Sequence, residues 1–219
     1  AYTAGVMDYL LETLEAWQQA KEKGEKVPGH NIMIKVITGA SAGGMTAAIS
    51  VVELFRRAAL KEKPQGYKSL MYQAWVEEID IKELLKAEDL RKDAQIKSLL
   101  DSTVIDKIAD AIIRPEDPPV WQPVPYVAEK LKLYLTLSNL RGLPYTMKLK
   151  GETDLPYGMM DHADYQYIQI SKDTTKVAWR RLRNAAVATG AFPVGLASRL
   201  IKRDTTEYQE RVLCDGRLV

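Results

Sequence analysis

The segment from Gly39 to Gly43 has the form GxSxG, with Ser41 at its centre. It follows an apolar run (IMIKVI, residues 32–37) and precedes a helical pattern that begins at Ala42. A serine on a tight strand-to-helix turn has a strained backbone, so its neighbours must be small to avoid clashes. The turn places the Ala42 N–H at a helix N-terminus, which favours negative charge. We therefore predict a nucleophile elbow in which Ser41 attacks, Ala42 supplies half of an oxyanion hole, and the small residues are Gly39, Ala40 and Gly43.

Two other interpretations of this turn are open. The small residues could serve only to pack a helix closely on a strand, or the turn could bind a phosphate group. Phosphate-binding turns usually have the spacing GxGxxG or end in Gly-Lys-Ser/Thr, and the motif has neither pattern. A nucleophilic serine is therefore the favoured prediction.

A serine hydroxyl needs a base, and the chain has two histidines. His30 precedes the apolar run and should lie at the sheet edge opposite Ser41. His162 lies between Asp161 and Asp164, so a Ser-His-Asp triad is an open alternative, although a polar loop is the favoured interpretation of this segment. A metal site is not expected, because one histidine with two close acids lacks a typical ligand spacing.

An acidic residue also follows an apolar run near the end of the sequence. Residues 211–214 (RVLC) favour a strand, and Asp215 and Gly216 come directly after it. Open α/β sheets hold their ligands at the carboxyl ends of strands, and Gly216 would let the chain turn sharply there. Asp215 is therefore a second candidate base, although Asp-Gly is also a common turn pair.

The elements that must position these residues alternate between helical and strand patterns. Helical spacing of apolar residues predicts helices over residues 5–23, 42–60 and 177–188. Continuous or alternating apolar runs predict strands over 32–37, 131–137 and 165–170, with a further strand (TMKLK) after a turn at 142–144. This order indicates an α/β fold.

The middle of the chain has a different character. Residues 69–113 are charge-rich with a helical pattern, and a proline cluster follows at 114–125. Because proline disrupts helix interiors and central strands, the cluster favours an extended connection. We interpret residues 66–125 as a helical insertion that ends in this Pro-rich connection.

Composition limits the classes of function. The chain has 219 residues, of which 46% are hydrophobic and 27% charged, as in ordinary globular proteins. A net charge of +2 gives no reason to expect a nucleic-acid partner. The single cysteine, Cys214, excludes an internal disulfide and a cysteine-based zinc site and permits a reducing compartment. The sequence contains no apolar stretch long enough to span a bilayer and no signal-peptide pattern.

Three separated segments resemble the patatin-like phospholipase family. Residues 1–14 (AYTAGVMDYLLETL) resemble the helix after its glycine-rich loop, and residues 37–49 (ITGASAGGMTAAI) resemble its nucleophile elbow. Residues 185–196 (AAVATGAFPVGL) and 214–219 (CDGRLV) resemble its Phe-Pro segment and Asp-Gly motif. The resemblance covers the chain apart from the helical middle. It implies one domain over residues 1–219, truncated at both ends, with a three-layer α/β/α sandwich and a mainly parallel sheet.

The resemblance also implies a chemistry, that of a lipid acyl hydrolase of phospholipase A or lysophospholipase type. Ser41 would be the nucleophile and Asp215 its base in a Ser-Asp dyad that forms an acyl-enzyme without a catalytic histidine. A free carboxylate is a weak base at neutral pH, so this dyad needs surroundings that raise its proton affinity. No cofactor, calcium or other metal is implied. Two departures stand out: the family's glycine-rich oxyanion loop would precede Ala1, and Arg217 replaces the usual Gly or Ala.

Two alternative functions remain. One is an esterase that uses a triad through His162, and the other is a non-catalytic lipid-binding or scaffold module of the same fold. The partner implied by the resemblance is a phospholipid or other lipid ester, reached by transient contact with a membrane surface. We expect a cytoplasmic protein that is peripheral at membranes, and the sequence indicates no protein partner.

Overall fold

The computed structural model describes residues 2–60, 62–88, 96–147 and 157–203. The described chain has mixed α/β content, with the helices and strands in this order: α1 (Tyr2–Glu22), β1 (Ile34–Gly39), α2 (Ala42–Ala59), α3 (Leu70–Tyr72), the π-helix η1 (Gln73–Glu78), α4 (Ile81–Leu84), α6 (Thr103–Ile113), β2 (Val127–Met147), β3 (Tyr157–Ile170) and α7 (Lys176–Gly190).

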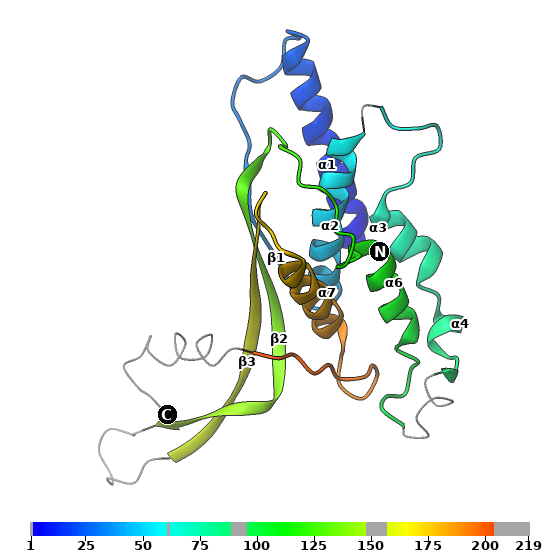
Figure 1. Cartoon of the computed structure of the whole chain (residues 1–219), viewed down its shortest axis with the longest axis vertical. Coiled ribbons are helices and arrows are strands. Elements are labelled where there is room, and N and C mark those ends of the chain that lie inside the picture. The colour runs from blue at the N-terminus through cyan, green and yellow to red at the C-terminus, as the bar shows by residue number, and fades with distance from the viewer. Residues whose placement is uncertain (1, 61, 89–95, 148–156, 204–219) are drawn as a thin grey trace.

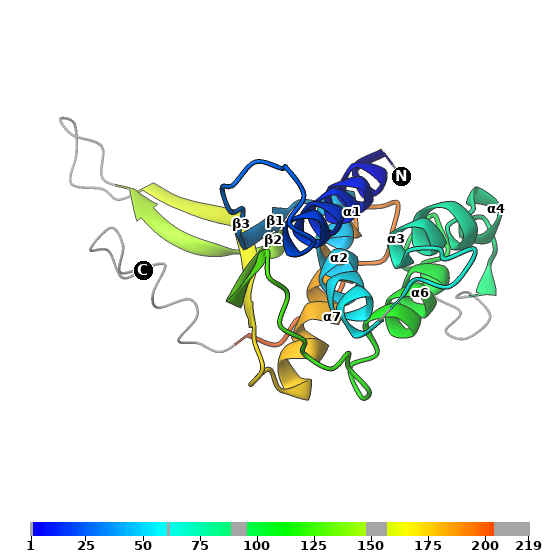
Figure 2. The ribbon, with the colours of Figure 1, turned by 90° about the horizontal axis from the view of Figure 1, so that it is seen from above.

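The strands form one sheet in the order β1-β2-β3. β1 pairs with β2 in parallel and β2 pairs with β3 antiparallel, so the described sheet is mixed rather than mainly parallel. The described helices all lie on one side of this sheet, while the β2–β3 hairpin extends away from them (Figures 1 and 2). The expected second helical layer is not seen in these residues.

A row of apolar residues crosses the sheet on the helix side. The register places Ile37 beside Leu133 and Leu133 beside Ile168, and all three side chains are buried. Alternate residues point to the other face, where the Tyr134 ring lies 4.9 Å from the ring of Tyr167. Because side chains of a strand alternate between the two faces, one face of the sheet is apolar and buried, and the helices pack on it.

Helix α2 lies at the centre of the core and contacts β1, α7, α1 and α3. Its small and branched residues are buried on nearly every side: Ala47, Ala48, Ile49, Val51, Val52, Leu54 and Phe55. A helix that is apolar almost all round must be enclosed by other elements. The position of α2 fixes its first residue, Ala42, directly after the turn that contains Ser41.

A buried ionic group joins α2 to α1 and to the insertion. Glu53 is fully buried and accepts hydrogen bonds from Arg57 Nε at 2.7 Å and Tyr67 Oη at 2.6 Å. Arg57 also pairs with Asp8 of α1. Burial, reinforced by the hydrogen bond to Glu53, raises the pKa of Tyr67. Within the described residues, Arg57 Nη1 and Glu15 Oε2 are buried without a hydrogen-bond partner and lie 3.8 Å apart, so this part of the group is held by charge attraction alone.

Most predicted elements are confirmed. Helices occur where residues 5–23, 42–60 and 177–188 predicted them, β1 covers most of the predicted run 32–37, and the described part of 69–113 contains helices and no strand. Residues 114–125 have neither helix nor strand, as their prolines indicate. Residues 211–214 lie outside the described residues.

Two predictions about the sheet, one of a turn before a new strand and one of a loop, are wrong. The turn expected at 142–144 is part of β2, which continues to Met147, so TMKLK does not begin a separate strand. The register slips between Ser138 and Leu143, where Gly142 has a positive φ of 71°, so the extra residues form a bulge and not a turn. β3 begins at Tyr157 and contains His162, which therefore lies on a strand and not in a polar loop.

Candidate nucleophile elbow

Ser41 has the strained backbone that the sequence predicts. Its φ is 51° and its ψ is −127°, between the end of β1 and the start of α2. A positive φ is uncommon for any residue with a side chain and clusters at functional sites. Ser41 is exposed to solvent. The GxSxG segment is therefore a tight strand-to-helix turn with a solvent-facing serine.

The glycines around the turn differ in whether a side chain would fit in their place. A Cβ at Gly39 would lie 2.4 Å from the Gly43 carbonyl oxygen, so residue 39 must be glycine. A Cβ at Gly43, in contrast, would meet nothing within 4 Å, so the expected clash at this position is wrong. The second required glycine is Gly44, whose Cβ would lie 2.6 Å from the Thr189 methyl carbon. The sequence motif did not single out Gly44, although a third glycine directly after the motif was a signal for it.

The polar groups at the elbow are available to a ligand. Ser41 is the N-cap residue of α2, but its hydroxyl makes no capping hydrogen bond. Within the described residues, the Ala42 N–H at the first helical position has no acceptor, while Gly43 N–H donates to the Ala40 carbonyl at 2.9 Å. A serine whose only role was structural would usually cap the helix. Here Ser41 and Ala42 are both exposed residues, and the hydroxyl does not cap the helix.

Neither histidine is brought to Ser41. His30 precedes β1 and packs edge-on against Trp17, with ring centroids 4.7 Å apart. The His162 Nδ1 atom lies 2.6 Å from the Asn139 carbonyl oxygen across the β2 bulge. Asp164, the acid that the triad alternative placed beside His162, forms an ion pair with Arg203, with Oδ1 and Nη2 3.0 Å apart. The structure thus engages His162 in the β2–β3 hairpin and shows no hydrogen bond between it and Ser41.

The second member of the predicted dyad cannot be placed. Asp215, Gly216 and Arg217 lie outside the described residues. Their relation to Ser41 therefore stays a prediction from the sequence resemblance.

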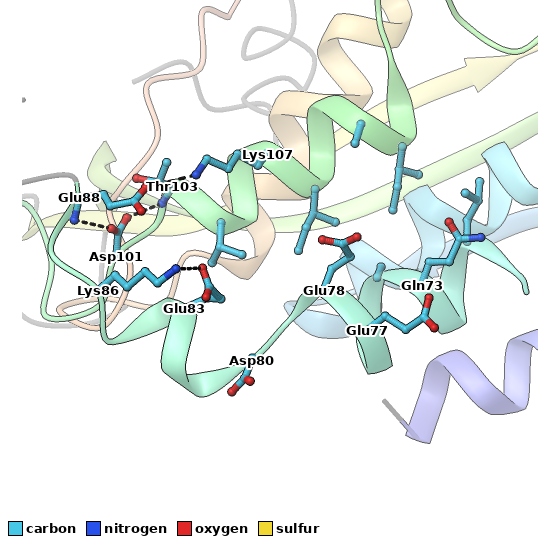
Figure 3. Close-up of a pocket in the computed structure, with 16 residues that line it drawn as sticks. Gln73, Glu77, Glu78, Asp80, Glu83, Lys86, Glu88, Asp101, Thr103 and Lys107 are labelled. Carbon is cyan, nitrogen blue, oxygen red and sulfur yellow. Dashed lines mark hydrogen bonds and ion pairs between the residues drawn. The ribbon is translucent and has the colours of Figure 1, made fainter.

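A cavity of about 520 Å³ lies within the helical insertion, between η1, α4 and α6, and includes none of the elbow residues (Figure 3). Its rim is acidic but mostly paired: Lys86 binds Glu83 at 2.6 Å and Lys107 binds Glu88 at 3.2 Å. Asp101 accepts from the backbone N–H of Thr103 at 2.8 Å. In the described residues, no group of three or more His, Cys, Asp or Glu side chains could hold a metal ion.

None of the helices in the described part of the chain is both long enough and apolar enough to cross a membrane.

Comparison with known proteins gives a relative but no function. No protein-family model matches the chain, and no solved structure does. The chain is 33% identical over 256 residues to the uncharacterized protein y4iI of Sinorhizobium fredii (strain NBRC 101917 / NGR234), an alignment that covers 95% of this chain. The chain spans 36% of the length of that relative. It is therefore similar to one segment of a much longer protein.

Proposed function

We propose that this chain is the catalytic part of a serine-dependent lipid acyl hydrolase of patatin type, with a three-layer α/β/α sandwich as its complete fold. One observation carries the proposal: Ser41 is an exposed residue with a positive φ at a strand-to-helix turn, and its hydroxyl makes no capping hydrogen bond. This geometry presents a hydroxyl to a substrate at the positive end of α2. The sequence resemblance supplies the lipid substrate and the dyad.

The proposed reaction assigns a role to Ser41, Ala42 and Asp215, the last from the sequence resemblance alone. Ser41 Oγ attacks the ester carbonyl carbon while its proton passes to the carboxylate of Asp215. The carbonyl oxygen gains negative charge and accepts a hydrogen bond from the Ala42 N–H. The alcohol leaves with the proton from Asp215, and the acyl group stays on Ser41. Water, deprotonated by the same carboxylate, then attacks the acyl carbon; the acyl–Oγ bond breaks, the fatty acid leaves, and Ser41 Oγ takes back the proton from Asp215.

Exposed apolar residues that follow the end of α7 suit a lipid substrate. Phe192 and Val194 follow the end of α7, whose Thr189 binds the Ser41 backbone, and they are 52% and 71% exposed. Leu99 is 75% exposed and donates its backbone N–H to the Val194 carbonyl at 2.9 Å. Val194 also has a φ of 69°, a strained conformation for a branched residue. These side chains would contact acyl chains during transient membrane binding by a cytoplasmic protein.

Hydrolysis of phospholipid vesicles tests the proposal. The full-length protein should release fatty acid from phosphatidylcholine vesicles, and Ser41→Ala and Asp215→Asn should each abolish the release. Ser171→Ala is the matched control, because its hydroxyl accepts from the Asp173 N–H in a surface turn and should leave the rate unchanged. Vesicle binding without fatty-acid release in the folded wild-type protein would contradict the proposal and support a non-catalytic lipid-binding module.

A further inference from the structure

The side chain of Thr189, near the end of α7, joins the elbow to the sheet. Its Oγ1 accepts a hydrogen bond from the Ser41 backbone N–H at 2.9 Å. The same hydroxyl donates to the Thr136 carbonyl oxygen of β2 at 2.7 Å. One hydroxyl of α7 therefore binds two backbone groups that lie 148 and 53 residues away from Thr189 in the sequence.

The chemistry of this position requires a hydroxyl. The two partners are an N–H donor and a carbonyl acceptor, and of the side chains close to threonine in size only serine can also accept and donate through one atom. Valine has the same shape but would leave both backbone groups without this partner. A strained backbone such as that of Ser41 persists only when its surroundings fix it from several directions.

The packing around Thr189 is as close as its hydrogen bonds suggest. Its methyl group lies against Gly44, where a Cβ would come within 2.6 Å of Thr189 Cγ2. One residue later, a Cβ at Gly190 would come within 2.4 Å of Met45 Sδ. The end of α7 thus approaches the first turn of α2 at two glycines, and the hydroxyl of Thr189 is held at a fixed place beside the elbow.

We propose that Thr189 is a positioning residue for Ser41, an inference that rests on the proposed function. By holding the Ser41 N–H against β2, Thr189 orients the peptide between Ala40 and Ser41. That peptide sets the direction of the Ser41 side chain and the position of the next N–H, that of Ala42. Thr189 binds the Ser41 backbone N–H, so in this proposal it acts through the geometry of the elbow.

The rate at which a fluorophosphonate modifies Ser41 measures this role. Thr189→Val should lower the second-order rate about 10- to 100-fold, since a displacement of roughly 1 Å in a reacting group costs about 100-fold. Thr189→Ser keeps the hydroxyl and should restore the rate to within about threefold of wild type. Both rates are measured well below the melting temperature of each variant.

Thr175→Val is the matched control. Thr175 caps the opposite end of α7, where its hydroxyl accepts from the Ala178 N–H at 3.4 Å. Its loss should lower the melting temperature and leave the modification rate at Ser41 unchanged. A purely structural role for Thr189 would produce this same result in Thr189→Val.

The possible outcomes separate the two proposals. Modification of wild-type Ser41 with an unchanged rate in Thr189→Val overturns the inference and leaves the proposed function standing. An unmodified wild-type Ser41 overturns the proposed function, and the inference falls with it. If Thr189→Val does not fold, Thr189→Ser and Thr189→Ala carry the test: similar rates in these two variants would overturn the inference, because only serine retains the hydroxyl.

Discussion

The two glycines on either side of Ser41 should respond to alanine in opposite directions. A Cβ at Gly39 would lie 2.4 Å from the Gly43 carbonyl oxygen and 2.6 Å from the Gly44 backbone nitrogen. These atoms belong to the backbone of the first turn of α2 and cannot rotate away. The strand end and the helix would have to separate by about 1 Å, which is a form of overpacking.

The size of the effect follows from this contact. Overpacking typically costs about 1–3 kcal/mol, and in a protein of this size about 1 kcal/mol lowers the melting temperature by about 2–4 °C. We expect Gly39→Ala to lower it by about 4–10 °C. Gly43→Ala adds a methyl group in open space on a helix, where alanine is favoured over glycine by about 0.5–1 kcal/mol. We expect it to raise the melting temperature by about 1–4 °C.

Scanning calorimetry of the two variants at the same protein concentration would check this prediction, with urea unfolding as a second measurement. Equal shifts, or a larger loss in Gly43→Ala, would refute the steric account of the elbow. Gly5→Ala is a further control, because a Cβ at Gly5 in α1 also meets nothing within 4 Å.

Three further predictions concern the rest of the molecule. Glu53→Ala leaves buried partners without their acceptor and should lower the free energy of unfolding, measured in urea, by about 3–5 kcal/mol. Glu12→Ala, at an exposed site, should lower it by less than about 0.5 kcal/mol. Similar losses in the two variants would contradict a buried ionic group. The raised pKa of Tyr67 means that the folded state holds this proton more tightly than the unfolded state, so stability should be full below about pH 10 and fall as the pH rises further. Tyr67→Phe should show a smaller fall in urea unfolding between about pH 9 and 11, and an identical fall would refute this assignment. His162→Ala should leave the fluorophosphonate rate at Ser41 unchanged, and a loss of more than about tenfold would favour the triad.

The elbow could be predicted from the sequence because its determinants are local. An apolar strand, a run of small residues and a helix pattern follow one another within about twenty residues, so the strained Ser41 was expected before any contact was known. The contacts that decide which glycine is required come from residues distant in the sequence. Gly43 and Gly44 look alike in the sequence, and the closest atoms that distinguish them belong to Thr189 of α7.

The β2–β3 hairpin shows why other predictions were wrong. Gly142 and Pro144 are typical turn residues, and a turn was the natural interpretation. β2 continues through them because Gly142 takes a left-handed backbone in a bulge and because β1 ends at Gly39, beside Leu135. Past that point one edge of β2 has no strand beside it in the described residues, so the missing N–H of Pro144 disrupts no pairing there. The same pairing converts the expected loop at His162 into a strand.

The most direct test of the central claim is the identification of the residue that a fluorophosphonate modifies in the full-length protein. The account predicts one modified residue, Ser41, by peptide mass mapping, with no modification in Ser41→Ala and a sharp fall in Asp215→Asn. A folded wild-type protein in which Ser41 remains unmodified would contradict the claim that this turn holds an activated serine.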